Sequence, residues 1–216
     1  MIDEPGYPVE PWCVRETRLD LDVLAQSESV FALANGHVGL RGNLDEGEPF
    51  GIPGTYLNSF FEQRPLPYAE SGFGYPEEGQ TIVNVTNGKI IRLLVEDEPF
   101  DVRYGELHAH ERVLDLRAGT LHRTAEWTSP AGRRVKVRST RLVSFQHRSV
   151  AAVCYEVEAI ERTRVIVQSE LVANEEVPSQ SGDPRVAAAL QEPLSPSPRT
   201  SRRTASCWST APARAA

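Results

Sequence analysis

The sequence predicts an all-β protein built as an antiparallel β-sandwich. About seven segments alternate apolar and polar residues, which is the pattern of strands with one buried and one solvated face. Turn-forming residues separate these segments at short intervals, as in antiparallel sandwiches. The 216 residues are 40% hydrophobic and 25% charged, which is a globular composition and excludes a collagenous, coiled-coil or wholly disordered chain.

The N-terminal part opens with residues 9–21, a mixed polar and apolar stretch suited to a strand. Residues 24–29 are compatible with one helical turn. A short apolar run, residues 30–34, ends at Asn35-Gly36, a dipeptide typical of a tight turn. We therefore expect a helical turn and a short buried strand before this dipeptide.

The strongest hairpin signal in the chain is Asn87-Gly88. It separates a β-rich run, residues 81–85, from residues 89–96, which we expect to return beside that run. Further strands are expected at residues 112–117, 120–128, 133–143, 149–160 and 164–173, with a turn at residues 129–132. Residues 183–190 are compatible with the start of a helix.

Residues 47–79 form a long stretch rich in Gly, Pro and aromatic residues. We expect extended loops there, with isolated buried aromatic side chains such as Tyr56, Phe60 and Phe61. Long ordered loops often carry function, so this stretch is the expected place for a ligand surface.

The charge and cysteine content exclude several classes of protein. The net charge is −7, the opposite of what a binder of nucleic-acid phosphates needs. No apolar run approaches the roughly 20 residues of a membrane-spanning helix, and the acidic N-terminus lacks the features of a signal peptide. Three widely separated cysteines predict neither a disulfide framework nor a zinc knuckle. We expect a cytoplasmic protein with no nucleic-acid or membrane partner.

The composition changes abruptly near residue 194. Residues 195–216 are almost entirely Ser, Pro, Thr, Ala and Arg, without an acidic residue. We expect two parts, a β-sandwich domain over residues 1–194 and a disordered tail over residues 195–216. Two interpretations of the tail stay open, a natural flexible segment and an out-of-frame translation of GC-rich DNA.

Two short motifs resemble parts of binding sites, but their residues favour structural roles. Residues 36–42, GHVGLRG, lack the Lys-Ser/Thr of a phosphate loop, so their glycines are expected to serve tight backbone geometry. His108 and His110, with Glu106 or Glu111 nearby, could form part of a metal site. Zinc needs three or four ligands, and no spacing nominates the others, so we expect half-exposed strand histidines and no metal.

Acidic clusters occur at residues 45–48, 96–98 and 175–176. Glycoside chemistry uses two carboxylates set roughly 5–10 Å apart across a sugar, which adjacency in a loop does not provide. We expect solvated turn charges at these positions. No nucleophile–base set is evident either, so the sequence nominates no catalytic residue, no substrate-binding residue and no cofactor.

A series of segments nevertheless agrees with a known family. It begins with residues 28–43, ESVFALANGHVGLRGN, followed by residues 54–58, GTYLN. Later matches occur, in order, at residues 114–121, Trp127, residues 129–132, 141–144 and 183–186. As an ordered set, spanning about residues 10–194, they resemble the N-terminal part of family 65 glycoside hydrolases, which include maltose, trehalose and kojibiose phosphorylases.

The resemblance implies a module of a longer enzyme. Family members carry an N-terminal β-sandwich, a helical linker and an (α/α)6 barrel with the catalytic glutamate. Inorganic phosphate is the co-substrate of the phosphorylases, and water attacks in the hydrolases. The resemblance therefore implies an incomplete sandwich that is inactive alone, a parent enzyme acting on α-glucosides, and a sandwich involved in homodimer contacts.

Two other functions stay open. A stand-alone carbohydrate-binding module would need an exposed aromatic platform, for which Tyr56, Phe73, Tyr75 and Trp127 are the candidates. A non-catalytic assembly domain would instead dimerise or dock on a separately encoded barrel.

Overall fold

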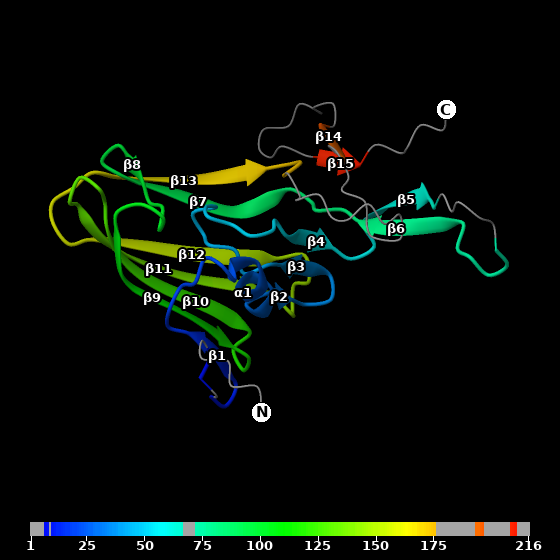
Figure 1. Ribbon diagram of the computed structural model, residues 1–216, viewed down its shortest axis with the longest axis horizontal. Helices are drawn as coiled ribbons and strands as arrows, with labels where there is room; N and C mark the ends of the chain where they lie inside the picture. The colour runs from blue at the N-terminus through cyan, green and yellow to red at the C-terminus, as the bar shows by residue number, and fades with distance from the viewer. Residues whose placement is uncertain (1–6, 9, 67–71, 176–192, 197–207, 211–216) are drawn as a thin grey trace.

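The computed structural model describes residues 7–8, 10–66, 72–175, 193–196 and 208–210. Its largest element is a five-stranded antiparallel sheet (Figure 1). In spatial order the strands are β1 (Cys13–Glu16), β9 (Glu106–Asp115), β10 (Thr120–Thr128), β11 (Arg134–Val143) and β12 (Ala151–Ala159). The prediction of an all-β sandwich is confirmed.

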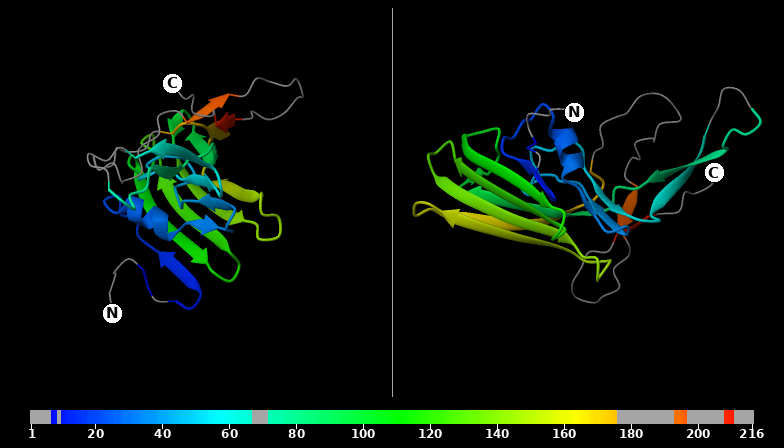
Figure 2. Two further views of the ribbon diagram at one scale, coloured as in Figure 1. Left: turned by 90° about the vertical axis from the view of Figure 1, so that its right-hand side faces the viewer. Right: turned by 90° about the horizontal axis from the view of Figure 1, so that it is seen from below.

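A second layer faces this sheet (Figure 2). It contains β13 (Val165–Val172), β7 (Asn87–Val95) and the short β8 (Glu98–Pro99), in that order. Side chains from β7, β10 and β11 meet between the layers in one apolar cluster, made of Leu93, Val95, Phe100, Ala125, Trp127, Val135 and Val137. Burial of these alternating side chains explains why the two layers pack.

Smaller elements complete one end of the sandwich. A three-stranded sheet joins β2 (Leu33–Ala34), β3 (Val38–Leu40) and β4 (Thr55–Leu57), and the short helix α1 (Leu24–Val30) precedes it. A second apolar cluster lies here, made of Phe31, Leu33, Val38, Leu40, Leu114, Leu121 and Val143. The ribbon β5 (Phe61–Pro65) and β6 (Glu78–Ile82) projects beyond it (Figure 1). Within the described residues, no helix is long and apolar enough to cross a membrane.

Glycines serve backbone geometry in the segment 36–42, as expected. Gly36 has a φ of +79° in the turn between β2 and β3. At Gly42 an added Cβ would lie only 2.6 Å from Cβ and 2.7 Å from the backbone oxygen of Phe31, so the two backbone segments pass closer than any side chain would permit. These glycines therefore shape the β2–β3 corner rather than a phosphate loop.

The hairpin expected at Asn87-Gly88 is wrong. Asn87 begins β7, which pairs with β13 and β8, whereas β6 pairs with β5. The Asn87 side chain explains the difference: its Oδ1 accepts the backbone N–H of Lys89 at 3.1 Å and its Nδ2 donates to Glu175. The Asn87 side chain thus makes a tertiary hydrogen bond at the start of a strand instead of stabilising a local turn.

The later strand predictions, from residue 120 to residue 173, are confirmed within two residues at each end. The opening strand is shorter than expected, since β1 is limited to Cys13–Glu16, and the strand expected at 112–117 begins earlier, at Glu106. The 120–128 strand is β10, and the turn at 129–132 closes with the N–H of Gly132 donating to Ser129 O at 2.8 Å. The loop stretch 47–79 instead contains β4, β5 and β6. The three aromatic side chains named there are less buried than expected: Tyr56 and Phe60 are half-buried, and Phe61 is 39% exposed.

Two predictions fall largely outside the described residues. The helix start at residues 183–190 is one of them. In the expected tail, β14 (Leu194–Pro196) pairs with β15 (Trp208–Thr210), and residues 197–207 and 211–216 lie outside the described part. The boundary at residue 194 and the nature of the tail stay predictions.

The outermost strand β13 leaves apolar side chains exposed on one side of the sandwich. In β13, Val167 is 52% and Leu171 is 62% exposed, and the strand has β7 as its one partner within the described residues. Unprotected apolar edges of this kind pair with other chains, and lysine on an edge prevents such pairing.

We therefore expect the purified chain to self-associate with rising concentration and Val167→Lys to shift it toward monomer. Sedimentation velocity over a concentration series measures this. Leu116→Lys, which changes a 55%-exposed residue just beyond the end of β9, is the matched control. A wild-type chain that stays monomeric throughout would contradict the expectation.

Candidate functional site

Three arginines occupy inward positions of the five-stranded sheet. Arg112 on β9, Arg123 on β10 and Arg141 on β11 are 1%, 3% and 2% exposed. Strand alternation places Arg123 on the same face as Leu121 and Ala125, which belong to the two different apolar clusters. A charged layer therefore separates the two clusters, and each guanidinium needs an acceptor inside the sandwich.

Asp45 and Glu46 supply acceptors to two of these arginines. Arg141 Nη2 donates to Asp45 Oδ1 at 2.7 Å, and Ser139 Oγ donates to Asp45 Oδ2 at 2.5 Å. Arg123 Nη1 donates to both oxygens of Glu46 at 2.8 Å, and the Tyr155 hydroxyl donates to Glu46 Oε1 at 2.7 Å.

The charges in this cluster shift two pKa values in opposite directions. Burial acts to raise the pKa of Asp45, but the charges of Arg141 and Arg123 outweigh it and hold the pKa below its usual value. Burial and the neighbouring Glu46 carboxylate raise the pKa of Tyr155. The aspartate thus stays ionised and the tyrosine stays a donor across the neutral range.

Glu16 supplies the acceptor for the third arginine. Arg112 Nε donates to Glu16 Oε2 at 2.6 Å, Ser27 Oγ donates to Oε1 at 2.6 Å, and His110 Nε2 lies 3.1 Å from Oε2. Burial acts to raise the pKa of Glu16, but the hydrogen bonds from His110 and Arg112 and the charge of Arg112 lower it to about 2. Burial lowers the pKa of His110.

The acidic clusters therefore behave differently from the expectation of solvated turn charges. That expectation is wrong for Asp45 and Glu46, which are 2% and 3% exposed. It holds for Asp97, whose side chain is 91% exposed in the turn between β7 and β8. Glu175 accepts hydrogen bonds from two asparagine side chains, and Glu176 lies outside the described residues.

The two histidines of the possible metal pair, His108 and His110, lie in different environments. A bulge in the β9–β10 pairing falls at His108, which breaks the alternation. His108 Nε2 consequently bonds Thr128 Oγ1 at 2.7 Å, whereas His110 is buried against Glu16 rather than half-exposed. In the part of the chain that the structure describes, no group of three or more His, Cys, Asp and Glu residues is arranged for a metal.

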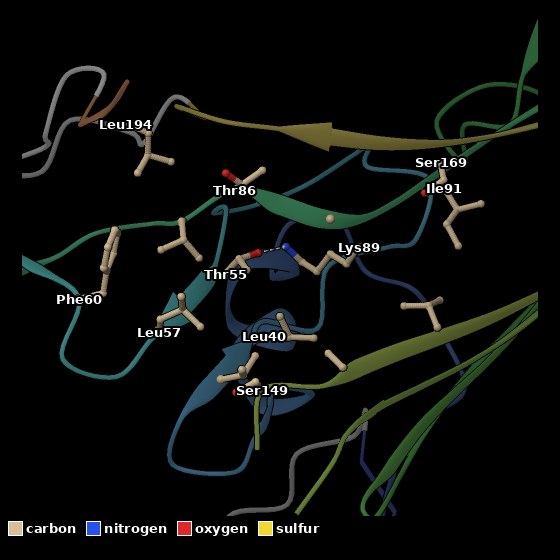
Figure 3. A pocket seen from close by; sticks show the side chains of 15 residues that line it. Leu40, Thr55, Leu57, Phe60, Thr86, Lys89, Ile91, Ser149, Ser169 and Leu194 are labelled. Atoms are coloured by element: carbon tan, nitrogen blue, oxygen red, sulfur yellow. Dashed lines mark hydrogen bonds between the residues drawn. The ribbon is translucent and has the colours of Figure 1, made fainter. Parts of the chain in front are cut away.

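A cavity of about 580 Å³, partly open to solvent, lies near the β2–β4 sheet (Figure 3). Its wall is mainly apolar, with side chains from β3, β4, β7 and β12 and the loops beside them. Hydroxyl groups of threonine and serine residues lie among them. The principal apolar side chains are Val38, Leu40, Leu57, Phe60, Ile91 and Val153.

Lys89 is the charged residue on the wall of this cavity. Its Nζ donates to Thr55 Oγ1 at 3.1 Å, and Figure 3 shows the two groups pointing toward one another. The residue is 3% exposed. Burial and the charge of Arg141 lower the pKa of Lys89 to about 8, although Glu175 and Glu28 act to raise it.

A family model, glycosyl hydrolase family 65 N-terminal domain, matches residues 14–214. The chain belongs to this family. The resemblance carried by the ordered sequence motifs is thereby confirmed.

Relatives of this family 65 chain include enzymes with assigned activities. An uncharacterized glycosyl hydrolase of Mycobacterium tuberculosis strain H37Rv is 74% identical over 195 residues, which are 90% of this chain and 25% of the relative. The α,α-trehalose phosphorylase of Thermoanaerobacter brockii is 35% identical over 193 residues, which are 87% of this chain and 25% of the relative. The chain thus spans about a quarter of the length of the curated relatives it matches.

A solved structure supports the same fold. A protein from the human microbiome assigned as a kojibiose phosphorylase superposes with a TM-score of 0.72 at 26% identity, over 79% of this chain and 23% of that one. The family 65 sandwich is therefore shared in its architecture as well as in its sequence.

The opening family 65 motif has a clear place in this structure. Residues 28–43 run from α1 through the β2–β3 hairpin and then enter the sandwich. There the backbone oxygens of Gly42 and Asn43 accept from Arg112 and Arg141. The motif therefore anchors the charged layer. The signal that sequence reasoning missed was the arginine at inward strand positions, which requires a buried carboxylate elsewhere.

The four aromatic candidates for a sugar platform do not form one. Trp127 is fully buried in the core, where its Nε1 donates to Tyr104 O at 2.7 Å. Tyr56 is half-buried in β4, whereas Phe73 and Tyr75 are exposed beside the β5–β6 ribbon. Two of the four therefore remain as surface aromatics.

Proposed function

We propose that this chain is the non-catalytic β-sandwich unit of a family 65 enzyme that acts on α-glucosides such as trehalose, maltose or kojibiose. The similarity to the trehalose phosphorylase, 35% identity over 87% of the chain, is the observation that carries the proposal. In such an enzyme inorganic phosphate or water would be the co-substrate, and no further cofactor is needed. We place the enzyme in the cytoplasm and its sandwich in homodimer contacts.

The chemistry of the buried carboxylates supports a non-catalytic role. A glycosidase needs an acid and a base or nucleophile that face a sugar. The deeply buried Glu16, Asp45 and Glu46 instead face arginines inside the fold. Their hydrogen-bonding capacity is used by buried arginines and hydroxyl groups within the sandwich, which leaves them unsuited to proton transfer with a substrate.

An activity assay of the purified chain tests the proposal. We expect no glucose and no glucose 1-phosphate from trehalose, maltose or kojibiose, with or without phosphate, above a blank without protein. The trehalose phosphorylase of Thermoanaerobacter brockii, assayed in parallel, shows that the conditions support phosphorolysis. The proposal would be overturned if the chain released either product and this activity copurified with the chain through two successive columns.

The exposed aromatic residues motivate one alternative, a stand-alone carbohydrate-binding module. Phe73 is fully exposed and Tyr75 is 56% exposed. Calorimetric titration with the same three disaccharides distinguishes the two: saturable binding that Phe73→Ala removes favours the module. An absence of binding by a folded chain favours the non-catalytic unit.

A further inference from the structure

The cavity beside Lys89 has the size of a small-molecule site. Ligand pockets usually measure about 300–1,000 Å³ and combine an apolar wall with a few polar groups. This one measures about 580 Å³ and lies between β3, β4, β7 and β12. The proposed function of the chain makes no use of it.

Lys89 differs from the other buried cations of the sandwich in its partners. Arg112, Arg123 and Arg141 each contact a carboxylate within 2.8 Å. Within the described residues, the ammonium of Lys89 has one hydrogen bond, to the neutral hydroxyl of Thr55, and no ion pair. An ammonium carries three donors, so two of them lack a partner in that part of the chain.

The charges around Lys89 do not neutralise it. Arg41 and Arg141 are near enough to repel the ammonium, and Glu28 and Glu175 attract it from beyond ion-pair distance. Glu28 is engaged by Arg41 at 3.6 Å, and Glu175 accepts from Asn84 and Asn87. A buried charge without a counter-ion is costly, so an anion entering the cavity would relieve that cost.

The wall restricts what kind of anion fits. Alternation along β7 places Lys89 and Ile91 on the same face as Leu93, toward the interior. Leu40, Leu57, Phe60 and Val153 supply most of the remaining wall. The hydroxyl residues Thr86, Ser149 and Ser169 lie among them. A sugar would leave those of its hydroxyls that face the apolar side chains unpaired. A hydrocarbon chain would gain by burial there.

We propose that the cavity binds an amphipathic monocarboxylate, with the carboxylate on Lys89 Nζ and Thr55 Oγ1 and the hydrocarbon chain along Leu40, Leu57 and Ile91. The site rests on charge complementarity at one end and apolar complementarity at the other.

Titration of the full chain with octanoate, below its micelle concentration, tests the proposal by calorimetry. We expect saturable binding with one site per chain. Lys89→Met keeps the length of the side chain and removes the charge, so it should weaken binding about tenfold or more. Lys136→Met, which changes the other lysine of the chain away from the cavity, should leave binding unchanged.

Two further arms separate the proposed site from unspecific uptake. Octanol has the same hydrocarbon chain without the charge, and it should bind wild type and Lys89→Met equally weakly. Val153→Phe should block octanoate by filling the cavity, and circular dichroism verifies that each variant is folded. No saturable octanoate binding, or equal losses in Lys89→Met and Lys136→Met, would overturn the proposal.

Discussion

Asp45→Ala should destabilise the fold by about 3–5 kcal/mol, the usual cost of removing one partner from a buried ion pair. Asp45 accepts from Arg141 at 2.7 Å and from Ser139 at 2.5 Å, in the interior of the sandwich. Without its carboxylate, the Arg141 guanidinium keeps two backbone oxygens, of Arg41 and Asn43, as acceptors and loses its counter-ion. Urea unfolding followed by tryptophan fluorescence measures the loss.

Asp97→Ala is the matched control for this experiment. Asp97 also contacts an arginine, Arg164, but its side chain is 91% exposed, and exposed pairs contribute little to stability. We expect a nearly unchanged unfolding midpoint. Equal shifts for Asp45→Ala and Asp97→Ala would show that the buried charged layer does not stabilise the sandwich.

The second large effect is expected from Glu16, as a loss of stability in acid. Its pKa is about 2 in the folded chain and 4.5 in the unfolded one, so the unfolded chain binds more protons between these values. The ionised carboxylate therefore contributes about 3 kcal/mol above pH 4.5. This contribution falls away as the pH drops from 4.5 toward 2.

Glu16→Gln isolates this contribution, because glutamine resembles the protonated acid. The variant should be less stable than wild type by about 3 kcal/mol at pH 7, and the gap should narrow steadily below pH 4.5. Urea unfolding at pH 7, 5, 4, 3.5 and 3 measures both chains. A gap that is constant with pH would mean that the ion pair with Arg112 is not its source.

Apolar–polar alternation predicted strands reliably where one face of the strand is solvent-exposed and the other is buried. The 120–128 strand could be assigned from alternation because its inward residues, Arg123 excepted, are apolar and its outward residues are polar. Local pattern failed at Asn87-Gly88 because a neighbour distant in sequence, Glu175, engages the asparagine. Local pattern also failed to identify Lys89 as a candidate site residue, since a single lysine in a strand does not indicate whether it is buried or what it contacts.

The sequence by itself determined the fold class, through strand periodicity, and the family, through an ordered set of motifs along the chain. Only the tertiary structure decided that Asp45 and Glu46 are buried partners of Arg123 and Arg141, and that Lys89 lies on the wall of an apolar cavity. The physical reason is separation along the chain. Alternation is a property of neighbouring residues, whereas the pairing of charges across the sandwich joins residues 77 to 96 positions apart, which no local pattern encodes.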